Sequence, residues 1–147
     1  MSKKQTKTEN ITSNNKGFSL IELLIVMIIM GLLASLVGPR LFGKLGMAKE
    51  KTARSQIAML MTSLGTYRLD IGSFPSEDEG LTVLMKNKSN HKKWDGPYLA
   101  KDLPIDPWGS AYIYKNPGTH GEIDIISLGL DGKEGGEGEK EDIGSWN

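Results

Sequence analysis

The strongest hydrophobic feature of the sequence is an uninterrupted apolar run near its beginning. Leu23–Val37 reads LLIVMIIMGLLASLV, where only Gly31 and Ser35 dilute the large aliphatic side chains. Extended back to Phe18, the run contains a single ionisable residue, Glu22. Twenty helical residues span about 30 Å, which matches the hydrocarbon thickness of a bilayer. The pattern therefore predicts a helix that crosses a membrane or packs in an equally dry environment.

After this run the pattern changes to that of an amphipathic helix, in which apolar residues recur every three or four positions. These residues are Ala53, Ile57, Leu60, Leu64 and Tyr67. Pro39 lacks a backbone donor and is expected to kink or loosen the helix locally. We predict one long helix over residues 18–70 that ends before Gly72. Its first part, 18–38, spans the membrane, and its second part, 39–70, packs against a globular head.

The head is expected to comprise residues 71–147. Ser76 and Glu79 have the spacing of a capping box, which predicts a short helix that ends near Asn87. The stretch 94–108 contains three prolines, which exclude a regular helix or a central strand and predict an irregular loop.

Two short segments of the head have the composition of β-strands. Residues 111–115 read AYIYK, residues 123–128 read IDIISL, and a turn sequence that contains Pro117 and Gly118 separates them. An antiparallel hairpin of this size is marginal alone, so it should pack on the long helix. The predicted fold class is α+β, with a long N-terminal helix packed on a small antiparallel sheet.

Charge is distributed unevenly although the chain as a whole is neutral. Residues 1–17 carry four lysines against Glu9, a net charge of +3, so the remainder carries −3. A positive flank before an apolar run favours retention of that end in the cytoplasm, which would put the head on the other side. The chain has no cysteine, which excludes a disulfide framework.

Glu22 is unusual because a carboxylate at the head of a membrane helix is costly without a partner. One interpretation is an acid that faces headgroups and water at the interface. The other requires a cation: a cut between Gly17 and Phe18 would create an α-ammonium one helical turn from Glu22. That ammonium could belong to the same chain or to a neighbouring copy.

The sequence KGFSLIELLIVMIIMGLLAS resembles the class III signal of type IV pilins and type II secretion pseudopilins. The resemblance implies a leader, residues 1–17, that a prepilin peptidase removes by cleavage between Gly17 and Phe18. It also implies methylation of the new Phe18 amine and a role for Glu22 in subunit assembly. A generic signal anchor is the alternative interpretation of the apolar run alone.

The head narrows the resemblance to the major pseudopilin of type II secretion, because YRLDIGSFPSEDEGL and GPYLAKDLPIDPWGSAYIYKNPG are similar to that family. This implies a subunit that polymerises with itself into a periplasmic pseudopilus, which drives export of folded proteins through the outer membrane. The implied partners are minor pseudopilins, the prepilin peptidase, an inner-membrane assembly platform and an outer-membrane secretin. The implied location is the bacterial inner membrane, crossed once, with the head in the periplasm. The alternatives are a subunit of another pilus or a membrane-anchored calcium-binding module that does not polymerise.

Residues 129–145 combine glycines with six acidic side chains. Calcium takes oxygen ligands from flexible loops, and glycines allow backbone carbonyls to turn inward. A solvated acidic tail is the alternative. The resemblance implies a calcium loop, with ligands from the Leu128 carbonyl, the Asp131 side chain, the Lys133 carbonyl and the Asp142 side chain. Glu139 and Glu141 are candidates to replace them.

The sequence does not indicate an enzyme. His91 and His120 lie 29 residues apart in expected loops, and no cysteine or clear acid dyad accompanies them. The basic loop 91–93 is too short to indicate nucleic-acid binding.

Overall fold

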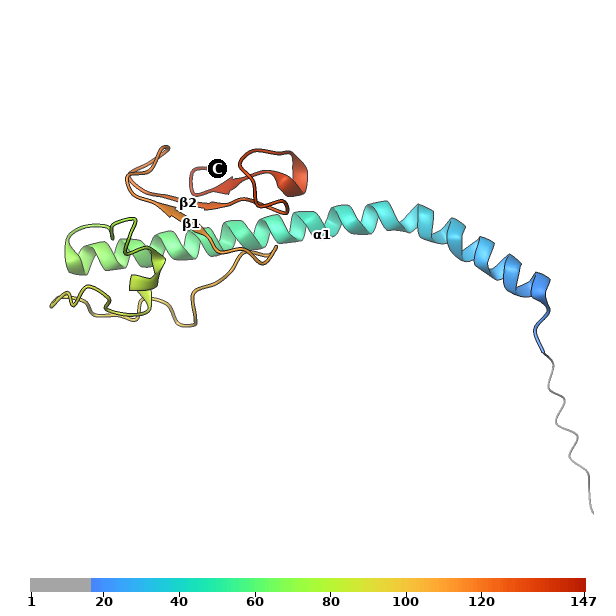
Figure 1. Ribbon diagram of the computed structural model, residues 1–147, viewed down its shortest axis with the longest axis horizontal. Coiled ribbons are helices and arrows are strands. Elements are labelled where there is room, and N and C mark those ends of the chain that lie inside the picture. The colour runs from blue at the N-terminus through green and yellow to red at the C-terminus, as the bar shows by residue number, and fades with distance from the viewer. Residues whose placement is uncertain (1–16) are drawn as a thin grey trace, which may run out of the picture. The chain divides into compact units, whose positions relative to one another are not determined.

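The computed structural model describes residues 17–147, and the predicted leader therefore lies outside the described residues except for Gly17. The chain divides at Pro39 into two units, the second of which is Arg40–Asn147. One helix, α1 (Leu20–Ile71), begins in the first unit and continues through Pro39 into the second (Figure 1).

The part of α1 that belongs to the first unit is covered by no other segment of the described chain. Every side chain in its most apolar window is solvent-accessible, and Leu20 is 88% exposed. The helix is long and apolar enough to cross a membrane. An aliphatic surface of this extent is unfavourable in water, so lipid or neighbouring protein must cover it.

The second half of α1 carries the predicted apolar stripe, and all of its members are buried. Gly46 and Ser63 extend the buried face at the same helical spacing. The head supplies the other side of this core, and three of its most buried side chains are Leu84, Ile125 and Val83.

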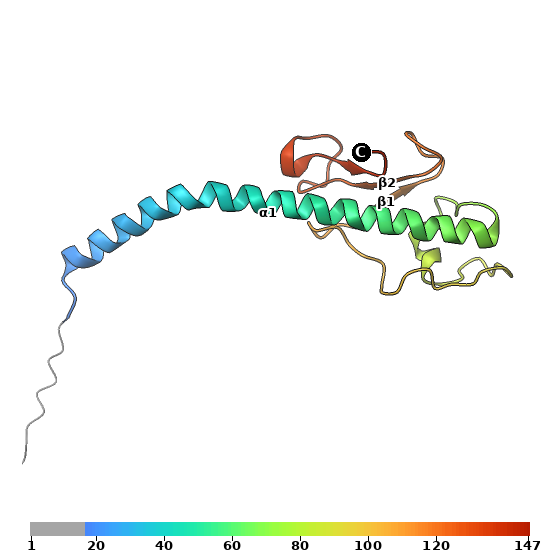
Figure 2. The same ribbon diagram turned by 180° about the vertical axis from the view of Figure 1, so that it is seen from behind.

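A three-stranded antiparallel sheet packs along this half of α1 (Figure 2). Its strands are β1 (Ile113–Lys115), β2 (Asp124–Ser127) and β3 (Ile143–Gly144), in the order β1-β2-β3. Tyr114 pairs with Ile125 in the first ladder, so the predicted hairpin is confirmed with shorter strands. The sequence analysis missed β3 because two residues after an acidic, glycine-rich stretch carry no period-2 pattern.

The predicted short helix that ends near Asn87 is wrong. The capping box forms, since the Ser76 N–H donates to Glu79 Oε2 (2.9 Å) and the Glu79 N–H donates to Ser76 Oγ (3.3 Å). Gly80, at φ +59°, then breaks the helical path, and only the 3₁₀ helix η1 (Leu81–Leu84) follows. A capping box therefore marks a turn here, because the residue after Glu79 is in the left-handed region.

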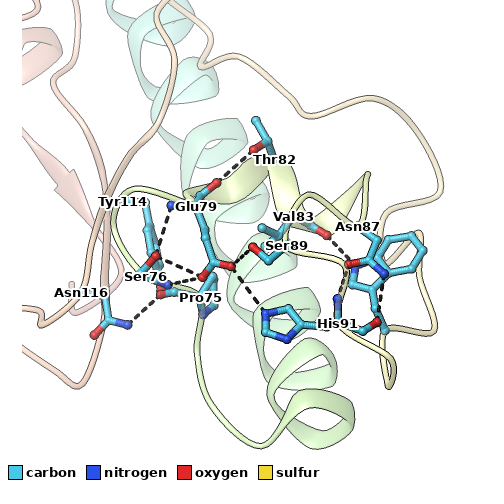
Figure 3. A network of polar contacts seen from close by, with 11 residues as sticks. Pro75, Ser76, Glu79, Thr82, Val83, Asn87, Ser89, His91, Tyr114 and Asn116 are labelled. Atoms are coloured by element: carbon cyan, nitrogen blue, oxygen red, sulfur yellow. Dashed lines mark hydrogen bonds and ion pairs between the residues drawn. The ribbon is translucent and has the colours of Figure 1, made fainter.

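Glu79 also holds the loop that follows η1 (Figure 3). Its carboxylate accepts a short hydrogen bond from Ser89 and lies 3.5 Å from His91 Nε2. The Ser89 hydroxyl and the Ser76 backbone N–H stabilise the charged form and lower the pKa of Glu79. One carboxylate thus connects the Ser76 turn to the loop at residues 89–91.

The segment 94–108 is irregular, as its prolines predict, and passes beside α1 between η1 and β1 (Figure 1). The Trp94 indole N–H donates to the Val83 carbonyl (2.9 Å). Tyr98 packs edge-on against Tyr67 and donates its hydroxyl to Asp70 (2.9 Å). Aromatic side chains therefore fix a segment that has few backbone pairings of its own.

We predict that Leu64→Ala destabilises the head by about 2–5 kcal/mol, because Leu64 is completely buried and its removal leaves a cavity in the core. Leu69→Ala is the matched control on the same helix, since Leu69 is 84% exposed. Urea unfolding of a soluble fragment, residues 43–147, measures both. Equal midpoints for the two variants would contradict the packing described here.

Candidate functional site

The start of α1 is capped by its own sequence. Ser19 precedes the first helical residue, and its hydroxyl accepts the Glu22 backbone N–H (3.2 Å). The spacing Ser19-x-x-Glu22 is that of a capping box, and this spacing was the available sequence signal for a helix start that the sequence analysis missed. Ser19 at this position satisfies a backbone donor that a membrane environment would otherwise leave unpaired.

The Glu22 side chain is exposed and has no ion-pair partner among residues 17–147. Gly17 and Phe18 lie outside the helix, and a Cβ atom added at Gly17 would meet nothing within 4 Å. The predicted cleavage position is therefore an accessible, non-helical peptide bond that one residue, Phe18, separates from the Ser19 cap. An accessible, irregular backbone is what a peptidase requires of its substrate.

The second site lies in the loop between β2 and β3. Several of its glycines have positive φ, and two are required by close backbone approaches as well. A Cβ on Gly129 would lie 2.8 Å from the Glu139 carbonyl oxygen, and one on Gly136 would lie 2.5 Å from that of Lys140. The loop folds back on itself through these contacts, with the short helix η2 (Gly138–Lys140) near its end.

Asp142 is the most constrained of the predicted metal ligands. Its Oδ2 accepts the Gly135 N–H (2.9 Å), whereas its Oδ1 is buried without a hydrogen-bond partner among the described residues. A buried, unpaired carboxylate oxygen is costly, and a cation would satisfy it. Leu128 and Asp142 line one cavity of about 220 Å³, together with Glu134.

The other predicted ligands are less closely gathered. Asp131 Oδ1 accepts the Lys133 N–H (3.2 Å), and neither residue lines the cavity shared by Leu128 and Asp142. Among residues 17–147, no three His, Asp or Glu side chains form a group that could hold a metal by themselves. A cation in this loop would therefore depend on backbone carbonyls as well as on carboxylates.

Glu139, a candidate replacement ligand, contacts the long helix instead. A Cβ on Gly46 of α1 would lie 2.6 Å from Glu139 Oε1, so the side chain occupies the space that Gly46 leaves open. The two residues also line one cavity with Trp108. This contact holds the loop against α1, while Glu141 remains exposed.

Asp124 is a buried acid that the sequence analysis did not single out. Its Oδ2 accepts the Thr119 N–H (2.6 Å) and the His120 N–H (3.0 Å), which holds the β1–β2 turn. Burial raises the pKa of Asp124, but these hydrogen bonds and the His120 ring together outweigh it and lower the pKa. The sequence signal for this buried acid was its position between Ile123 and Ile125 in a predicted strand.

The two histidines are not brought together. His91 lies beside Glu79, and His120 lies 3.4 Å from Asp124 and stacks on Trp146 at a centroid distance of 3.7 Å. Each histidine therefore pairs with a separate acid that holds a turn or loop.

Comparisons with known proteins agree with this architecture. The family model "Type II secretion system (T2SS), protein G" matches residues 40–146, and the "Prokaryotic N-terminal methylation motif" matches residues 12–38. The chain is 42% identical to the type II secretion system core protein G of Pseudomonas aeruginosa, over 89% of this chain and 94% of the relative. It is 43% identical to that of Vibrio cholerae, over 89% and 91% respectively.

A solved structure agrees as well. The crystal structure of the major pseudopilin from the type 2 secretion system of enterohaemorrhagic Escherichia coli matches with a TM-score of 0.59 and 35% identity, covering 74% of this chain and 95% of that chain. The predicted fold class, a long N-terminal helix on a small antiparallel sheet, is therefore confirmed. Because the family model spans most of the chain and the relatives match about nine-tenths of it, this chain belongs to the type II secretion system protein G family, the pseudopilus subunits.

Proposed function

We propose that this chain is the major subunit of the pseudopilus and that its assembly is driven by burial of the uncovered half of α1 between copies. The observation that carries the proposal is the apolar surface from Phe18 to Val37, which no described part of the chain covers. A monomer can hold this surface in lipid, and a filament can bury it against identical helices. Membership of the protein G family supports burial of this surface in a filament.

The proposed maturation begins at the exposed Gly17–Phe18 bond. A prepilin peptidase cleaves it and the Phe18 amine is methylated, in line with the methylation motif matched at residues 12–38. The remaining chain starts one residue before the Ser19 cap, so its ammonium lies close to the first turn of α1. Glu22, which has no partner among the described residues, is the acid within reach of it.

Glu22 would then direct assembly. A charge on an apolar helix surface is tolerated only when paired, and an incoming subunit can supply the pairing cation at Phe18. The monomer waits in the inner membrane with its head in the periplasm, and the assembly platform stacks it below the last subunit. Growth moves the filament and its minor pseudopilins toward the secretin, which pushes folded substrates outward.

Calcium is proposed to close the β2–β3 loop. Leu128, Asp131, Lys133 and Asp142 would hold it, with carboxylates from the two aspartates and carbonyl oxygens from the other two residues. The buried, unpaired Asp142 Oδ1 supports this proposal, as does the backbone folded tightly around Gly129. The bound cation would offset repulsion among the acids of a loop that has few apolar side chains to bury.

We predict that Gly17→Val blocks maturation, because a β-branched residue crowds a peptidase cleft that accepts glycine. Mass spectrometry of membrane fractions should find the uncut chain only. Gly31→Val is the matched control, since a Cβ at Gly31 also meets nothing within 4 Å, and it should be processed normally. A mature mass in the Gly17 variant would contradict the proposed cleavage.

We predict that Glu22→Val leaves membrane insertion and processing intact but lowers filament yield at least tenfold, because the pairing with Phe18 is lost (an effect of roughly the size of one strong ion pair). Chemical cross-linking of sheared filaments measures the yield. Glu77→Val, at an exposed position of the head, should give cross-linked ladders of normal length. Normal ladders from the Glu22 variant would refute the pairing.

We predict that chelation of calcium lowers the melting temperature of the 43–147 fragment by about 15–20 °C, since a ligand at a thousandfold excess over its Kd contributes about 4 kcal/mol. Asp131→Ala and Asp142→Ala should melt low and lose their response to calcium. Asp102→Ala, an exposed acid in the 94–108 segment, should behave like the parent. Identical parent curves with and without calcium would leave the loop as a solvated acidic segment.

A further inference from the structure

The outer side of α1 just beyond Pro39 carries a row of unpaired positive charges. We define the basic stripe as Arg40, Lys44 and Lys51, all of which are exposed. None of the three forms an ion pair within residues 17–147. Over residues 40–54 the helix carries five basic residues against Glu50 alone, a net charge of +4.

The basic stripe faces away from the head of its own chain. At 3.6 residues per turn, its members lie about 120–160° around the helix axis from Gly46, and within about 40° of one another. Gly46 marks the side of α1 that the β2–β3 loop contacts, and the buried Ala53 and Ile57 lie on the same side. The acidic loop of the same chain therefore cannot reach the stripe without leaving α1.

The β2–β3 loop has the opposite charge. Residues 131–142 carry six acidic and two basic side chains, a net charge of −4, and residues 131–141 are exposed throughout. None of the six acids forms an ion pair with the described part of the chain. Neither Glu134 nor Glu137 is a proposed calcium ligand or part of the Gly46 contact. Glu134 lines the cavity beside Asp142, whereas Glu137 lies outside it and keeps its charge available with the loop closed.

We propose that the β2–β3 loop of one subunit docks on the basic stripe of another copy in the filament, with Glu134 and Glu137 facing Lys44 and Lys51. This inference rests on the proposed function, because the two surfaces meet only between copies. An open filament of identical subunits needs two different, complementary surfaces on each chain. Opposite charges on opposite sides of α1, +3 for the basic stripe and −4 for residues 131–142, supply such a pair and would set the register between neighbours.

An anionic lipid surface is the other chemistry that could neutralise the stripe, but it fits less well. Lys51 lies about 16 Å beyond Arg40 along the helix axis, at 1.5 Å per residue. The headgroup region on each side of a bilayer is only about 5–8 Å thick. Headgroups can therefore contact Arg40 and Lys44 while the membrane segment is inserted, whereas Lys51 requires a protein partner.

Disulfide cross-linking tests the docking directly, because the chain has no cysteine of its own. The full-length chain would carry Lys51→Cys with Glu137→Cys and be oxidised after filaments have formed. Each subunit then links to two neighbours, so the expected product is a ladder of dimers and longer species. Lys88→Cys with Glu137→Cys is the matched control, since Lys88 is an exposed lysine elsewhere on the head, and it should stay monomeric.

Charge reversal supplies the second arm. Lys44→Glu with Lys51→Glu should lower the ratio of filament to membrane monomer about tenfold, or about 1.4 kcal/mol, which is within the usual range for the loss of two exposed ion pairs. Glu134→Lys with Glu137→Lys should do the same, and the four changes together should restore the ratio. Lys88→Glu with Lys92→Glu, both exposed, should leave it unchanged.

Each contrary outcome has a definite meaning. If the variant with Lys51→Cys and Glu137→Cys forms filaments at normal yield but gives no disulfide ladder, the docking is overturned and the proposed function stays intact. A second outcome would also overturn the docking. If Glu134→Lys with Glu137→Lys does not restore filaments to the variant with Lys44→Glu and Lys51→Glu, and that variant no longer binds vesicles of anionic lipid, the stripe binds lipid headgroups instead. If the parent chain yields no sheared filaments, the proposed function itself is contradicted.

Discussion

The apolar surface between Phe18 and Val37 is the constraint on which the rest of this structure depends. Its large side chains are all exposed in the described chain, from 49% at Ile25 to 88% at Leu20. Water is an unfavourable solvent for such a surface, so the chain is stable only in lipid or against other apolar helices. The proposed polymerisation would cover a helix surface that the described chain leaves exposed.

The head follows from the same helix, in its second half. α1 provides one continuous apolar face, and side chains of the sheet and of the segment 94–108 pack into the same core against it (Figure 1). The strands of the head are short, so individual side-chain hydrogen bonds hold its irregular segments in place. Asp106, for example, is buried and accepts hydrogen bonds from the backbone N–H groups of Trp108 and Ser110 and from the Ser127 hydroxyl (2.6 Å).

Charge divides into two classes in this fold. Buried acids such as Asp106 and Asp124 accept hydrogen bonds mainly from backbone N–H groups and hold turns in place, although Asp124 Oδ1 has no partner among the described residues. The exposed charges of the basic stripe and the β2–β3 loop have no ion-pair partners among the described residues. Acids of the first class stabilise the monomer, while charges of the second class cost little in water and are available to other molecules.

The sequence by itself determined the features that depend on local periodicity. The uncharged run predicted the first part of the helix, and the apolar residues at every third or fourth position predicted its buried face. Two alternating segments predicted the hairpin. Each pattern indicates which face of an element is buried away from water. Tertiary structure decided the rest. Gly80 turned a capping box into a bend, β3 formed from two residues because β2 offered an open edge, and Glu139 filled the space that Gly46 leaves on α1. These outcomes depend on contacts between residues far apart in the chain, or on a single backbone angle. Neither produces a periodic pattern in the sequence.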